Sequence, residues 1–347
     1  MLRPYDRAQL CFQLQTEIGH EGQNSEVFIA HDPQLDAEIV MKKIPKASFS
    51  CTAEYYEESS ILHKSSHPNV VPIHYACEDT NSVYLAMPYY AKGSINQLIN
   101  SKFLTVREII KLSSQFLSGL HNIHSKRLIH FDIKPDNILV SDQGEALVSD
   151  FGLSRPLGPN GLAGQDRMYL KMLPPEAFNG NEFSNKFDIY QAGLTIYRMC
   201  VGNTEFYRQF NQYGDQDNFD RDSFKFDVRM GRFPVRENFP EHLPQALIST
   251  MKKCLEPEPS QRYDAVIHII NNLADIQDEI LDWQYSEGDQ GRVWEKTEDQ
   301  RTVRLQVNAD GSSVATKQTA SGNLQNIRNY CLQSINRAKI KEFLRNH

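Results

Sequence analysis

Short runs of alternating apolar and polar residues, separated by turn-forming residues, fill the first part of the chain from residue 12 to residue 87. The clearest runs are 27–30, 38–41 and 83–86. A period of two is typical of strands that bury one face. The stretch at about 52–65 has a helical pattern instead. The pattern therefore predicts a small antiparallel sheet that carries one helix.

From residue 106 to residue 274 the apolar residues change to the period of an amphipathic helix. The change is clearest in one set of residues, Ile109, Leu112, Phe116, Leu120 and Ile123. Between the two patterns, segment 88–93 combines helix-breaking and small residues, which suits a hinge. We expect a mainly helical second lobe that follows this hinge.

Beyond residue 275 the composition changes, and segment 292–317 alternates around the turn signal Asp310-Gly311. A hairpin or small sheet is predicted there. Apolar residues then follow at helical spacing, which predicts that an amphipathic helix ends the chain. These are Leu324, Ile327, Cys331, Ile335 and Ala338. The tail is expected to form a small third module, packed around Trp283, Trp294, Val303, Leu305 and the Ile327/Cys331/Ile335 stripe.

The composition is that of a soluble globular protein, with 40% hydrophobic and 23% charged residues among 347. The net charge of −7 argues against general binding to nucleic acid or to an anionic membrane. The six cysteines are spread singly, as in a reducing compartment. No apolar run is long enough to span a membrane, and the first twenty residues are too charged for a signal peptide. We expect a cytoplasmic protein.

The most informative segment is 129–139, followed by Asp150-Phe151-Gly152. Asp132 could accept a hydrogen bond from an attacking hydroxyl, and Lys134 could neutralise a transferred phosphoryl group. Asn137 and Asp150 offer the hard oxygen ligands that Mg²⁺ prefers. This set of side chains is suited to magnesium-dependent phosphate chemistry.

The stretch resembles the catalytic loop and the Asp-Phe-Gly segment of eukaryotic-type Ser/Thr protein kinases. Lys134 favours the Ser/Thr branch of that family over the tyrosine branch. The resemblance covers about 12–274 and implies an α+β, two-lobed fold that uses ATP and Mg²⁺. It places an N-lobe at 12–87 and a C-lobe at 88–275, and leaves 283–347 as an accessory module of unknown family.

The segment 39–42 resembles the family's Val-Ala-Ile-Lys strand, so the resemblance makes Lys42 the ligand of the ATP phosphates, with Lys43 as a solvated neighbour. Counting back from Pro68 makes Glu58 the partner of Lys42, with Glu57 as the alternative. Both acids could also simply be solvated.

The phosphate-binding loop of the family is matched only in part. Gly19 and Gly22 stand for two of its glycines, Ser25 replaces the third, and Val27 follows. An ordinary hairpin turn is the alternative interpretation of this segment.

The resemblance also assigns the adenine pocket. Val40 stands where the family usually has Ala, which would narrow the pocket. Met87 would guard its back, and the backbone from Pro88 to Tyr90 would bind the adenine edge. Plain core and linker roles remain open for these residues.

Later landmarks separate the protein kinases from the aminoglycoside-type phosphotransferases. Segment 173–176 resembles the Ala-Pro-Glu segment, and segment 188–193 resembles the helix that anchors the catalytic loop. Segment 254–262 resembles a late motif whose Arg262 would pair with Glu176.

Two absences concern regulation. Phe131 stands where many relatives have an Arg that binds a phosphate on the activation segment. Between Arg155 and Phe183 there is no Ser or Thr to carry such a phosphate. We therefore expect activity without phosphorylation of this segment. Tyr169 replaces a usual Thr, and a packing role is expected for it.

These features predict a kinase that transfers the γ-phosphoryl group of ATP to Ser or Thr of protein substrates. The alternatives are a pseudokinase scaffold, suggested by the altered glycine loop, Phe131 and Tyr169, and a kinase for a small-molecule acceptor. The tail is either a packed domain or a module for partner docking or autoregulation.

Overall fold

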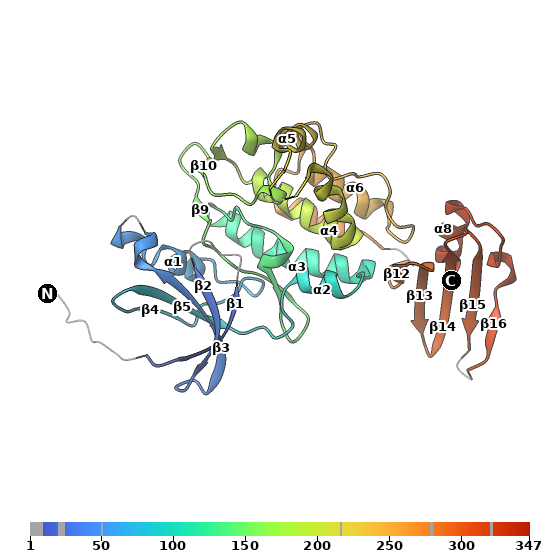
Figure 1. The fold of residues 1–347 in the computed structure, drawn as a ribbon, viewed down its shortest axis with the longest axis horizontal. Coiled ribbons are helices and arrows are strands. Elements are labelled where there is room, and N and C mark those ends of the chain that lie inside the picture. Colours follow the sequence, from blue (N-terminus) through green and yellow to red (C-terminus); the bar gives the residue numbers. More distant parts are fainter. Residues whose placement is uncertain (1–9, 20–24, 50, 216, 278–279, 320–321) are drawn as a thin grey trace.

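The fold has three successive parts, which follow one another across Figure 1: a small sheet (blue), a helical lobe (green to gold) and a second sheet (red). It is seen in a computed structural model that describes residues 10–19, 25–49, 51–215, 217–277, 280–319 and 322–347. None of the helices in these ranges is both long and apolar enough to cross a membrane.

The first sheet is antiparallel, with the strand order β1-β2-β3-β5-β4. Its strands are β1 (Gln13–Gly19), β2 (Glu26–Asp32), β3 (Ala37–Pro45), β4 (Tyr75–Glu78) and β5 (Ser82–Pro88). The predicted helix is α1 (Glu57–Lys64), preceded by a short 3-10 turn at Thr52–Glu54. The small antiparallel sheet with one helix is thus confirmed.

The second lobe is mainly helical, as predicted. Its helices are α2 (Ile95–Ser101), α3 (Val106–Ser125), α4 (Lys186–Phe210), α5 (Arg221–Arg229), α6 (Gln245–Cys254) and α7 (Val266–Ala274). This lobe also contains short strands, namely β6 (Leu128–Ile129), β7 (Ile138–Val140), β8 (Ala146–Val148), β9 (Arg155–Pro156), β10 (Ala163–Gly164) and β11 (Glu182–Phe183).

Helix α3 illustrates how the sequence specifies this lobe. Thr105 and Glu108 form a capping box that satisfies backbone N–H groups at the start of the helix. The apolar positions used to predict the helix are all buried in the main core. This helix packs against α7, α4 and β8, so it forms the centre of the lobe.

The tail forms a five-stranded antiparallel sheet with one helix. The elements are β12 (Gln284–Gly288), β13 (Gly291–Glu298), β14 (Arg301–Asn308), β15 (Ser313–Gln318), β16 (Leu324–Asn326) and α8 (Arg337–Asn346). Trp283, Trp294, Val303 and Leu305 lie in a hydrophobic cluster separate from the main core, and the Ile327/Cys331/Ile335 stripe packs against it. The predicted hairpin around Asp310-Gly311 is the β14–β15 connection.

The prediction of a helix through 324–338 is wrong for most of its length. Leu324 is 67% exposed and lies in β16, which pairs with β15. The four-residue spacing of Ile327, Cys331 and Ile335 does not reflect a helix. A strand end and a 3-10 turn at Arg328–Tyr330 bring these side chains to the core of the tail. The closing helix begins at Arg337 instead and buries Ile340, Phe343 and Leu344.

The tail is packed against the helical lobe. The ring of Tyr285 meets Phe103 edge-on, with the ring centroids 4.8 Å apart. Burial lowers the pKa of His242 to about 3, so its ring is neutral at ordinary pH. Its Nδ1 accepts a hydrogen bond of 3.2 Å from the indole N–H of Trp294. The contact between tail and lobe is therefore a packed, hydrogen-bonded interface.

Candidate active site

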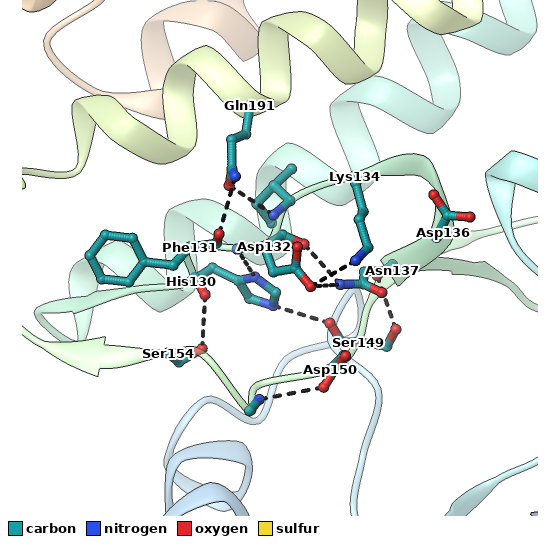
Figure 2. A network of polar contacts seen from close by, with 12 residues as sticks. His130, Phe131, Asp132, Lys134, Asp136, Asn137, Ser149, Asp150, Ser154 and Gln191 are labelled. Carbon is teal, nitrogen blue, oxygen red and sulfur yellow. Dashed lines mark hydrogen bonds and ion pairs between the residues drawn. The ribbon is translucent and has the colours of Figure 1, made fainter. Parts of the chain in front are cut away.

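The catalytic loop, 130–137, is held by helix α4, from which Gln191 points down to the loop in Figure 2. The carboxylate of Asp188 accepts hydrogen bonds of 2.8 Å from the backbone N–H groups of both His130 and Phe131. The amide of Gln191 accepts from the N–H of Ile133 and donates to the carbonyl of Phe131. Both side chains are completely buried, so the loop conformation is fixed by the core of the lobe.

Asp132 lies between two other predicted site residues. The ammonium of Lys134 is 3.0 Å from its Oδ2, and the amide of Asn137 donates to the same oxygen over 2.6 Å. The other carboxylate oxygen, Oδ1, is buried and has no hydrogen-bond partner among the described residues. An acceptor of this kind is available to a hydroxyl group.

The ionisation of Asp132 is sensitive to its surroundings. Burial raises the pKa of its carboxyl above the ordinary Asp value, and the nearby charge of Lys134 partly offsets this rise. An active-site carboxylate with a raised pKa is better suited to receive a proton.

Lys42 forms two ion pairs, and the one with Asp150 joins the two lobes. Its Nζ lies 2.7 Å from the carboxylate of Glu58 and 2.9 Å from that of Asp150. Burial alone would lower the pKa of Lys42, but the charges of Asp150 and Glu58 outweigh burial and raise it. The acid paired with Lys42 is thus Glu58 rather than Glu57.

The two carboxylates respond differently to this contact. The charge of Lys42 holds the pKa of Asp150 well below its ordinary value. Burial raises the pKa of Glu58, although Lys42 acts in the opposite direction. Lys43, next along β3, faces away and pairs with Glu26 over 2.8 Å.

The backbone turn at Asp150 and Gly152 places the carboxylate of Asp150 next to Lys42. Phe151 is buried, and its ring centroid lies 4.9 Å from that of His130. Asp150 itself has a positive φ of 59°. A Cβ on Gly152 would lie 3.4 Å from both the Asp150 Oδ1 and the Lys42 Nζ, so a glycine lets the chain pass close to this pair.

The nucleotide-facing residues predicted from the resemblance are placed only in part. Gly19 ends β1 opposite Val27 of β2, and Ser25 directly precedes β2. Gly22 lies outside the described residues. Val27 is in turn opposite Lys42 in the next strand pair. The strand register thus places Val27 beside Lys42, and Gly19 one strand further along the same row.

The residues assigned to the adenine pocket lie at the end of the same sheet. Val40 of β3 is opposite Met87 of β5, and Pro88 ends β5 at the start of the hinge. Tyr90 follows in the hinge, where burial raises the pKa of its hydroxyl. Val40, Met87, Pro88 and Tyr90 are all partly exposed.

Phe131 is an apolar anchor for the activation segment. Its side chain is fully buried at a positive φ of 66°. Its ring meets Phe187 at a centroid distance of 5.0 Å and Phe183 at 6.1 Å, both edge-on. Ala163 and Ile129 complete this cluster. The sequence showed that the Arg was missing but did not identify the aromatic partners, because these contacts are non-local.

Two further contacts involve residues of the activation segment, Tyr169 and Glu176. The Arg262 guanidinium forms a two-pronged ion pair with Glu176, with both hydrogen bonds 2.7 Å long, as predicted. The ammonium of Lys134 lies 4.6 Å from the ring centroid of Tyr169. This cation–π contact was not predicted, and it gives Tyr169 a packing partner inside the site.

Comparison with known proteins agrees with this geometry. Residues 12–272 match the family model described as the protein kinase domain. The chain belongs to this family.

Among related kinases, the chain is 27% identical over 274 residues, 76% of its length, to a probable serine/threonine-protein kinase PknB of Lactococcus lactis. It is 27% identical over 294 residues, 74% of its length, to a serine/threonine-protein kinase PknD of Chlamydia muridarum. It is also 25% identical over 230 residues, 65% of its length, to the tyrosine-protein kinase Src64B of Drosophila melanogaster. The chain spans between 30% and 41% of the length of these relatives.

Proposed function

We propose that this kinase transfers the γ-phosphoryl group of ATP to Ser or Thr side chains of protein substrates. The observation that carries the proposal is the buried carboxylate of Asp132, flanked by Lys134 and Asn137 and with one oxygen free of hydrogen bonds to described residues. That arrangement can orient a hydroxyl group and take up its proton.

Each charged group has a distinct role in this proposal. Asp132 orients the acceptor hydroxyl, while Lys134, 3.0 Å away, offsets charge on the phosphoryl group. Lys42 binds the ATP phosphates, and Glu58 holds it in position from 2.7 Å. The catalytic advantage arises from positioning and electrostatics.

The nucleotide is proposed to lie between a lobe at 12–87 and a lobe at 88–275. In this proposal Gly19, Ser25 and Val27 lie near the phosphates, and Val40, Met87 and the hinge from Pro88 to Tyr90 lie near the adenine. Gly22, assigned to the phosphates by the resemblance, lies outside the described residues. Support comes from the strand pairing of Val27 with Lys42 and of Val40 with Met87.

Asn137 and Asp150 fit a bound Mg²⁺. The amide nitrogen of Asn137 is used by Asp132, which leaves its amide oxygen without a hydrogen bond to the described residues. The low pKa of Asp150 keeps its carboxylate ionised. Oxygen donors of these two kinds are those that Mg²⁺ prefers. When bound, the ion would neutralise charge on the phosphate oxygens.

The residue type of the acceptor is tested by mapping phosphorylation sites by mass spectrometry after controlled expression of the wild type and of Asp132→Ala. Sites that depend on Asp132 are expected on Ser and Thr. Sites on Tyr would contradict the Ser/Thr assignment. No Asp132-dependent protein sites, together with transfer to a metabolite in an acceptor screen, would favour a small-molecule kinase.

Activity is proposed not to need phosphorylation of the activation segment. Phe131 presents a buried aromatic ring instead of a cation, and its contacts with Phe183 and Phe187 tie the segment to the lobe. Hydrophobic packing thus replaces the usual phosphate contact.

Enzyme treated with a phosphatase is therefore expected to keep its activity, because no Ser or Thr lies between Arg155 and Phe183. The measurement compares initial rates before and after treatment, with phosphate removal followed by mass spectrometry. A large loss of rate, traced to Tyr169, would contradict the proposal.

The pH dependence of kcat/KM should reflect the ionisation of the Asp132 carboxyl. The ionised carboxylate is the active form, so the rate falls as the pH drops through its raised pKa. Lys134→Met removes the charge that opposes this rise, so the acid limb of kcat/KM is expected at higher pH than in the wild type. Lys134→Arg keeps the charge and should leave the limb in place. An unmoved limb in Lys134→Met, with the protein still folded, would show that another group controls it.

A further inference from the structure

A groove separate from the active site lies between the helical lobe and the closing helix α8. Its volume is about 250 Å³. Phe239, Leu243 and Ile248, which are almost wholly buried, form its apolar floor. None of its lining residues belongs to the catalytic loop or the activation segment.

The rim of this groove is basic. Lys252 contributes from α6, while Arg337 and Lys341 contribute from α8. Arg345, one turn after Lys341, lines a smaller adjoining hollow of about 50 Å³ that shares Lys341 and Leu243. Arg337, Lys341 and Arg345, three of the four basic residues of α8, are spaced four positions apart and form one row along the helix.

Among the described residues, the acids that line the groove do not balance this row. Glu241 is already shared between Arg292, at 2.9 Å, and Arg337, at 3.5 Å. Glu237 is the other carboxylate among the lining residues. Within the described ranges Lys341 and Arg345 have no ion pair, and Lys252 has only the ring of Phe239 at 5.9 Å. This cationic surface lies on a chain whose net charge is −7.

Arg337 ties α8 to the helical lobe through Glu241 and the backbone carbonyl of Phe239, but Lys341 and Arg345 have no such contact within the described residues. Like charges four residues apart on a helix repel one another and destabilise it. Arg337 also stands in the first turn of α8, where the helix dipole disfavours a cation. The dipole favours only Arg345, in the last turn. An anionic ligand in the groove would relieve the repulsion along the whole row.

We propose that this groove binds an acidic segment of a protein substrate, with carboxylates on the basic row and an aliphatic side chain on the apolar floor. The proposal rests on the protein-kinase function above. A peptide fits better than a small anion, because the site combines an apolar floor with separated cations in two adjoining hollows. Docking here would raise the local concentration of a substrate without any change at the catalytic residues.

The first test measures binding without ATP, so its outcome does not depend on catalysis. A fluorescein-labelled peptide of alternating Glu and Leu is titrated with the full chain and followed by fluorescence anisotropy. We expect binding that weakens with salt, and no binding of the matched peptide with Gln for Glu. Equal binding of both peptides would overturn the proposal.

The double variant Lys341→Glu with Arg345→Glu is expected to weaken binding at least about tenfold. The matched control reverses two exposed charges elsewhere in the tail, Arg301→Glu with Arg328→Glu, and should bind as the wild type does. An equal loss in both variants would show a general charge effect and overturn the proposal. Lys341→Gln with Arg345→Gln is the milder replacement if the reversed variant does not fold.

The second test uses catalysis. Adding the Glu-Leu segment to an acceptor peptide should lower KM for the wild type but not for the groove variant, with kcat unchanged in both. Vesicles rich in phosphatidylserine are a separate arm. Groove-dependent binding of vesicles, without binding of the Glu-Leu peptide, would overturn the peptide proposal in favour of a membrane surface.

Discussion

Lys42→Ala is expected to lower the rate of phosphoryl transfer by about a thousandfold, the effect of removing one well-placed charge from a transition state. Lys42 is the cation that both Glu58 and Asp150 face, at 2.7 and 2.9 Å. Asp150→Ala should have a comparable effect, because it removes the proposed metal ligand. Initial rates with Mg²⁺ and ATP measure both changes.

The neighbouring residue offers a matched control. Lys43→Ala removes the same charge from the same strand, but Lys43 faces away and pairs with Glu26. It should keep a rate near that of the wild type. Near-wild-type turnover in Lys42→Ala or Asp150→Ala would contradict the site assignment.

The stability of these variants has to be followed, since Lys42→Ala leaves two carboxylates without their cation. The pKa of Glu58 is already raised by burial, so it can take up a proton at modest cost. Thermal unfolding of Lys42→Ala is therefore expected to show a folded protein. This would separate loss of chemistry from loss of structure.

Asp132→Ala is expected to lower turnover by roughly 10²-fold or more, the usual contribution of a positioned general base. The variant removes the carboxylate that Lys134 and Asn137 both contact. Binding of ATP should change little, because Lys42 and Asp150 are untouched. Both kcat and the dissociation constant of ATP are measured.

Asp142→Ala serves as the control for Asp132→Ala, because Asp142 is an exposed acid a short distance along the chain. It should leave kcat unchanged. A full rate in Asp132→Ala would mean that the carboxylate plays no part in transfer. A loss of ATP binding equal to the loss of rate would indicate a structural defect.

The local parts of the site could be predicted from the sequence. The catalytic residues lie close together in the sequence, in segments 129–139 and 150–152. Counting back from Pro68 favours Glu58 with Glu57 as the alternative, and the 2.7 Å contact with Lys42 identifies Glu58 as the partner. The strands of the first sheet follow from alternation along the chain. Such features depend on near neighbours or on a motif with fixed spacing.

Features that depend on distant contacts could not be predicted. The partners of Phe131 lie more than fifty residues away, at Phe183 and Phe187. In the tail, Leu324 lies in a strand, and Ile327, Cys331 and Ile335 lie in irregular segments on either side of a 3-10 turn, because pairing with β15 outweighs local periodicity. The proposed role of the basic row of α8 depends on the groove, and residues of the helical lobe form the other side of that groove.

The most direct test of the proposed chemistry follows labelled phosphate from γ-labelled ATP to a generic protein acceptor, with purified wild type and Asp132→Ala compared at equal concentration. Mg²⁺-dependent transfer to Ser or Thr by the wild type, reduced by roughly 10²-fold or more in the variant, is the expected result. Transfer no greater for the wild type than for Asp132→Ala, across a panel of protein acceptors, would contradict catalysis and leave a nucleotide-binding scaffold.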